Sequence, residues 1–102
     1  MYEQEMADLL KKMGVADADA LATVLVEAVY EQNHQRKVWS KKFDDSSNSY
    51  EWAGYLMKTF GEGLAGYPTK PMLFREKTIH SIALLFAAAM AVDRNPQNVV
   101  KK

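Results

Sequence analysis

The feature that most constrains the fold is a long apolar stretch near the end of the chain. The pattern from Phe74 is amphipathic up to His80, and from Ile82 to Val92 the sequence is apolar on every side. A helix that is apolar all round is a buried helix, so we predict a central helix over residues 72–94. The continuous apolar run is too short to span a bilayer, which predicts a cytoplasmic protein without membrane contact.

Two further helices are expected in the first half of the chain. Apolar residues recur at helical spacing over residues 1–14, and Gly14 is a residue that ends helices. A long second helix is expected over residues 17–42, where Asp17 or Asp19 can accept hydrogen bonds from the free amides of the first turn. The second half of this helix is polar, which places it on the surface or along a cleft.

The third helix follows a loop of turn-forming residues that begins at Asp44. We expect the helix over residues 49–66, with Ser49 as its N-cap and Pro68 beyond its end. Three glycines are expected to loosen its last turns: Gly61, Gly63 and Gly66. Together the four helices predict a compact all-α bundle in a single domain over residues 1–102.

The composition narrows the classes of partner and chemistry. The chain has 102 residues, of which 48% are apolar and 25% charged, as in a globular domain. Its 13 basic residues balance 13 acidic ones, so nucleic acid is not an expected partner. The absence of cysteine excludes disulfides, thiolate zinc sites and cysteine nucleophiles. The four helices carry more apolar surface than one short bundle can bury. We therefore expect a homo-oligomer in which the central helix packs against a second subunit.

A sequence pattern in the last two-thirds of the chain resembles a known family. Arg36, Trp39, an Asp-rich loop and Trp52 precede the segment 55–62, and residues 75–83 open the alanine-rich central helix. This order resembles the MazG-like all-α nucleotide pyrophosphohydrolase family, above all its short phage members. The resemblance implies a MazG-like helical fold and a site between the third and fourth helices.

The family's metal-binding motifs are altered here. The first family motif reads Glu-Glu, one residue, Gly-Glu, and the resemblance puts Lys58 and Thr59 at its paired glutamates while Glu62 is kept. The second reads Glu, two residues, Asp or Gln, and here Lys77 and His80 hold those positions. A single glutamate cannot complete an octahedral magnesium site, and lysines repel the ion. We therefore expect no metal, no cofactor and no family catalysis.

The same substitutions would suit an anionic ligand. Lysine binds phosphate directly as a point charge, and histidine can become cationic near neutral pH. We predict a non-catalytic binding protein for a nucleotide-derived anion, and the phage resemblance implies an anti-defence sponge that sequesters a nucleotide immune signal in the host cytoplasm. The predicted ligand-binding residues are Lys58, Glu62, Lys77, His80, Arg75, Tyr55 and Trp39.

Two other functions stay open from the sequence. A divergent magnesium-dependent nucleoside triphosphate pyrophosphohydrolase would use a rearranged set of carboxylates drawn from Glu62, Glu51, Glu76 and Asp93. A small phage inhibitor of a host complex would instead expose an apolar patch. A lysine on an amphipathic helix is usually a surface residue without a ligand. Aromatic residues at helical spacing usually belong to the hydrophobic core, and we predict this location for Trp52.

Overall fold

The computed structural model of the chain describes residues 2–39, 44 and 46–95. Its helices are α1 (Tyr2–Lys12), α2 (Ala18–Val38), α4 (Ser49–Gly66) and α5 (Pro71–Arg94), and the described residues contain no strand. The all-α class is therefore confirmed. None of these helices is both long and apolar enough to cross a membrane.

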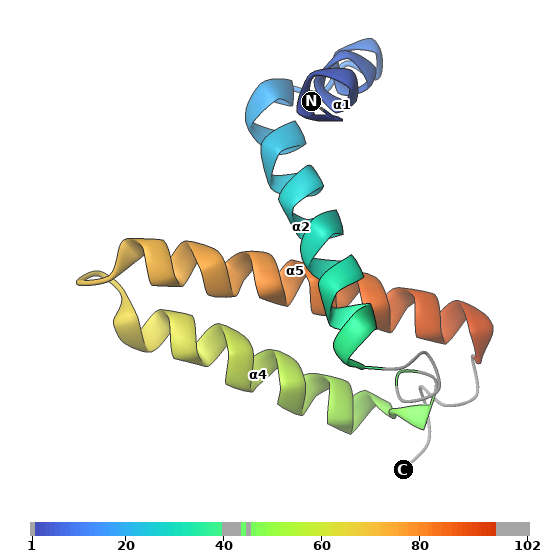
Figure 1. Cartoon of the computed structure of the whole chain (residues 1–102), viewed down its shortest axis with the longest axis vertical. Coiled ribbons are helices and arrows are strands. Elements are labelled where there is room, and N and C mark those ends of the chain that lie inside the picture. Colours follow the sequence, from blue (N-terminus) through green and yellow to red (C-terminus); the bar gives the residue numbers. More distant parts are fainter. Residues whose placement is uncertain (1, 40–43, 45, 96–102) are drawn as a thin grey trace.

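The helices form two regions that share α2. Figure 1 shows α4 and α5 as an antiparallel pair, with the second half of α2 crossing them and α1 lying at the far end of α2. We call α1 and the first turns of α2 the arm. The radius of gyration is 15.2 Å, above the roughly 13 Å typical of a 100-residue domain, because the arm projects from the α4–α5 pair.

The arm has a small core made largely of alanine. Its buried apolar residues are Ala7, Leu10, Ala18 and Ala22. The predicted side-chain cap of α2 is not formed. The backbone of Asp17 is in the left-handed conformation, with φ of 55°, and its side chain makes no capping hydrogen bond. Asp19 lies inside the first turn and pairs with Lys11 at 3.3 Å. The helix ends at Val38 with Trp39 extended, so it is shorter than expected, and residues 40–42 lie outside the described residues.

The α4 helix begins with a capping box one residue earlier than expected. The side chain of Asn48, not Ser49, accepts from the Glu51 amide at 3.0 Å, and the Glu51 carboxylate accepts from the Asn48 amide at 2.9 Å. Asp44 and Ser46, in the segment expected to be a loop, have helical conformation. The glycines do not loosen the helix, which continues to Gly66.

The α5 helix is buried along one side only. Ile79, Ala83, Ala87 and Ala91 recur every four residues and are buried, whereas Leu85 is 52% exposed. The expectation that residues from 82 onward are buried on every side is therefore wrong within one chain. The reason is geometric, because α2 and α4 cover part of the helix circumference and leave the rest to solvent.

Candidate functional site

A cleft lies where the second half of α2 crosses the α4–α5 pair. Its volume is about 330 Å³, and side chains from all three helices line it. Six of the seven predicted ligand-binding residues are among them: Trp39, Tyr55, Lys58, Glu62, Lys77 and His80. The structure thus brings together residues that are up to 41 positions apart in the sequence.

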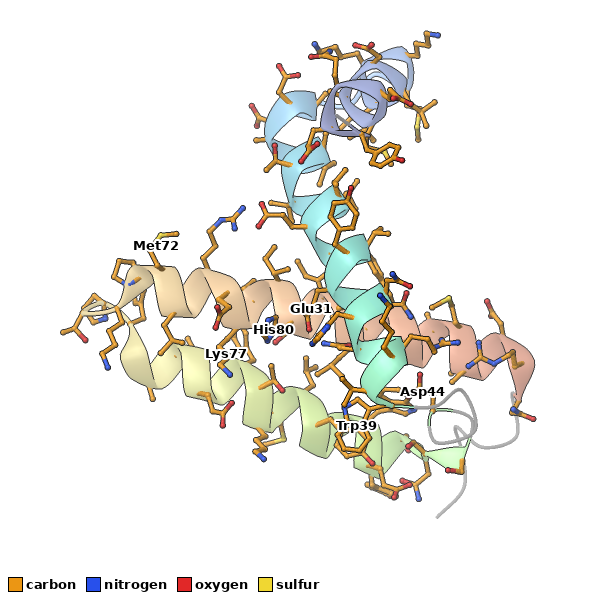
Figure 2. All side chains as sticks on the ribbon, viewed as in Figure 1. Glu31, Trp39, Asp44, Met72, Lys77 and His80 are labelled. Atoms are coloured by element: carbon orange, nitrogen blue, oxygen red, sulfur yellow. The ribbon has the colours of Figure 1, made fainter. Side chains whose placement is uncertain are left out.

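The cleft has an aromatic end and a charged end. Since α4 and α5 run antiparallel, the first turns of α4 face the later turns of α5. Trp52 and Tyr55 therefore share one end with Leu84, and their rings meet edge to face with centroids 5.8 Å apart. Trp39, 52% exposed, lies at this end as well (Figure 2). Trp52 is half-buried and lines the cleft, so its assignment to the core is wrong.

The charged end is built around an ion pair between α4 and α5. Lys77 reaches from α5 toward α4, and its Nζ lies 3.3 Å from Oε1 of Glu62 (Figure 2). Gly63 makes this approach possible, because a Cβ there would lie 2.7 Å from Cβ of Lys77. Such a distance is too short for two carbon atoms, so the absence of a side chain at Gly63 sets where Lys77 enters the cleft.

A second polar contact joins α2 to α5 beside the cleft. Nε2 of His80 lies 3.4 Å from Oε1 of Glu31, and Nε2 of Gln35 donates to Oε2 of Glu31 at 3.1 Å and to the peptide oxygen of His80 at 3.4 Å. The other amide atom, Oε1 of Gln35, is buried and accepts no hydrogen bond from the described residues. Glu31 thus contacts the His80 ring, and Gln35 holds both Glu31 and the His80 backbone. Neither α2 residue was among the predicted site residues.

Arg75 does not line the cleft. Its guanidinium makes a bidentate pair with Glu27, at 2.8 and 2.7 Å, and it lines a second hollow between α2 and α5. His80 lines both hollows. The hydrogen bond from Arg75 lowers the pKa of the Glu27 carboxyl below its ordinary value. This pair holds two helices together rather than facing the cleft.

The charges of the cleft are mostly paired. Arg36 lies 3.8 Å from Asp44, and Lys77 pairs with Glu62, whereas Lys58 is exposed and makes no ion pair within the described part of the chain. The described residues that line the cleft include three basic and two acidic side chains, a net charge of plus one when His80 is not counted. The polar second half of α2 is the sequence signal that could have identified Glu31 and Gln35.

The donor set does not favour a metal. Among residues 2–39, 44 and 46–95, no three His, Cys, Asp or Glu side chains lie close enough together to hold an ion. What the cleft offers instead is lysine nitrogen atoms, one histidine and flat aromatic rings. No protein-family model, curated protein or solved structure matches the chain.

Proposed function

We propose that this chain is a non-catalytic binding protein for a nucleotide-derived anion, held in the cleft between α2, α4 and α5. The observation that carries the proposal is the convergence of Lys58 and Lys77, from two helices, on one cleft that also contains Trp39 and Tyr55. Phosphate oxygens and a flat base are the two chemical groups that such a combination recognises together.

The two ends of the cleft would divide the ligand between them. A base stacks on the aromatic end, where each ring contact contributes about 1–3 kcal/mol by analogy with single-stranded nucleic acid binding. The phosphate lies between the lysines, and Lys77 exchanges its contact with Glu62 for one with the ligand. Lys58 is exposed, whereas the other two basic residues of the lining, Arg36 and Lys77, are half-buried.

The resemblance to the short phage MazG-like proteins extends the proposal. On such a scaffold, Lys58 and Lys77 stand where the family places carboxylates for magnesium, so a nucleotide would be held and not cleaved. A protein of this kind serves as a sponge, which lowers the free concentration of a nucleotide signal by binding it in the host cytoplasm. Its capacity depends on the number of chains present, since nothing turns over.

Calorimetric titration with nucleotides and cyclic nucleotides, in EDTA and then in magnesium, tests the proposal. We expect binding in EDTA and recovery of the intact nucleotide by chromatography. Lys77→Ala should weaken binding roughly 10- to 100-fold, the range of a charge-assisted hydrogen bond of about 1.5–3 kcal/mol. Arg75→Ala is the matched control, because Arg75 lies on the same helix outside the cleft, and it should bind like the wild type.

Glu62→Gln separates binding from residual catalysis. If Glu62 only neutralises Lys77, its removal frees the lysine and raises the affinity for the anion. If Glu62 is a magnesium ligand of a pyrophosphohydrolase, the same change lowers activity and magnesium-dependent binding. Magnesium-dependent release of pyrophosphate that is lost in Glu62→Gln, or no binding of any nucleotide, would contradict the proposal.

A further inference from the structure

The α1 helix carries an apolar stripe that faces solvent. Tyr2, Met6, Leu9 and Met13 follow one another at intervals of four, three and four residues, which places them along one line of the helix surface. Tyr2 is 54%, Leu9 53% and Met13 67% exposed, and Met6 packs partly against the arm core. We call these four residues the α1 stripe.

No described helix is in a position to cover the α1 stripe. The buried side of α1, with Ala7 and Leu10, faces α2, and α4 and α5 lie at the other end of α2 (Figure 1). The α1 stripe is therefore a second apolar face of the helix, beside the face that packs against α2. Three large exposed apolar side chains lie in one row on eleven helical residues and the turn that follows, and contiguous exposed apolar surface is typical of interaction sites.

The charges of α1 are arranged in opposite senses at its two ends. Glu3 and Glu5 lie in the first turn, and Lys11 and Lys12 in the last. Lys11 turns toward the arm, where it pairs with Asp19. Glu5 and Lys12 are seven residues apart, so they lie two turns apart along the same edge of the α1 stripe. One edge of the stripe is thus negative near its start and positive near its end.

A helix with this pattern is complementary to itself when reversed. We propose that α1 pairs in antiparallel orientation with α1 of a second copy of this chain, about a twofold axis that passes between the two helices at the middle of their length. In this register Tyr2 faces Met13 of the second copy, and Met6 faces Leu9 of the second copy. Glu5 lies beside Lys12 of the second copy, and the symmetry repeats each contact. Both opposite-charge pairs lie on the same side of the helix pair, because the twofold axis brings the same edge of each helix together.

The interface is small because α1 has only eleven residues. Interfaces well below the standard size bind weakly, so the dimer forms and dissociates with protein concentration. The inference uses no residue of the cleft and is independent of the proposed ligand. It differs from the expectation of packing through the central helix, because it assigns the interface to the N-terminal arm.

Sedimentation velocity of the full chain over a wide range of concentrations tests the surface. The wild type should shift from monomer to dimer, and Leu9→Glu should stay monomeric. Leu85→Glu is the matched control, since Leu85 is exposed to a similar extent, 52%, on α5. It should associate like the wild type. A wild type that is monomeric throughout, a Leu9→Glu protein that still associates, or loss of association in Leu85→Glu would overturn the proposal.

A charge exchange tests the antiparallel register. Glu5→Lys alone places lysine beside lysine in both pairs, and Lys12→Glu alone places glutamate beside glutamate, so each variant should dimerise roughly tenfold more weakly than the wild type. Mixed together, the two variants restore two opposite-charge pairs and should associate in a one-to-one ratio with near wild-type affinity. Circular dichroism of each variant verifies that α1 stays helical. No gain on mixing would overturn the proposed register.

Discussion

The α4–α5 pair packs aromatic rings between closely spaced helices, whereas the arm packs on alanine. Phe74 lies with its ring centroid 5.8 Å from that of Phe60 and 5.0 Å from that of Tyr67, and Gly63 lets the two backbones approach. The buried core of the arm has one leucine and three alanines, and three partly buried side chains pack against it: Met6, Val15 and Leu25. Tyr67 is 55% exposed and both phenylalanines are half-buried. Because even half-buried rings bury more area than methyl groups, we expect the pair to be more stable than the arm.

The N-terminal cap is also stronger in the α4–α5 pair than in the arm. The α4 helix starts with a reciprocal capping box between Asn48 and Glu51, and α2 starts at a left-handed Asp17 without a side-chain cap. Local signals therefore specify the pair, which surrounds the cleft, more strongly than the arm.

Hydrogen exchange should show the largest difference between the two regions. We expect the amides of α1 to exchange roughly a hundredfold faster than those around Ala83 in α5, since local opening of the arm breaks few buried contacts. Mass spectrometry of dilute protein measures the two rates. Raising the protein concentration should slow α1 selectively if it pairs between copies. Equal protection of α1 and α5 in dilute protein would contradict the comparison.

Gly63→Ala should destabilise the α4–α5 pair. The new Cβ would lie 2.7 Å from Cβ of Lys77, and relieving that overlap costs about 1–3 kcal/mol of unfolding free energy. Gly61→Ala is the control, because a Cβ there meets no atom within 4 Å and the higher helix propensity of alanine stabilises by about 0.5–1 kcal/mol. Urea unfolding of both variants gives the two values. A shift of the same sign in both would contradict the close approach.

Asn48→Ala should cost about 1 kcal/mol of unfolding free energy, because it removes the side-chain acceptor of the capping box. Asp17→Gly provides the contrast in the arm, since Asp17 makes no cap bond and glycine adopts its left-handed conformation without strain. The Asp17→Gly variant should be as stable as the wild type or more stable. Thermal unfolding measures the stability of both variants. A larger loss of stability in Asp17→Gly than in Asn48→Ala would contradict the difference between the two N-caps.

Arg75→Ala should have the smallest effect, a slight fall in Tm at neutral pH, because its pair with Glu27 is largely exposed. The folded-state pKa of Glu27 lies below its ordinary value, so the pair stabilises the fold at neutral pH. That contribution is lost as the pH falls through the lowered pKa. Differential scanning calorimetry should therefore find the Tm values of variant and wild type converging in acid. A difference that grows on acidification would contradict this assignment.

The sequence predicted the helices better than their contacts. Periodicity and turn residues are local signals, and they placed the helix ends within a few residues, except at Val38, where α2 ends short of residue 42. The N-cap of α4 was missed by one residue because Asn48 and Ser49 are both good caps, and only the structure shows which side chain accepts the hydrogen bond.

The cleft was anticipated only in part. Lys77 and His80 are three residues apart on one helical face and both reach it, whereas Arg75 is two residues before Lys77 and points to a different side. The Glu31–His80 contact joins residues 49 positions apart. No local pattern contains such a contact, because it depends on the angle at which α2 crosses α5.

That crossing gives α2 the geometry of a lever. The helix has 21 residues and is therefore about 30 Å long, with α1 at one end and the Gln35 wall of the cleft at the other. A tilt of about 5° around a fulcrum near its middle displaces each tip by about 1 Å, in opposite directions. If α2 tilts as a straight rod, a contact that shifts α1 would also shift the Gln35 wall of the cleft. Two surfaces without a common residue would then move in step.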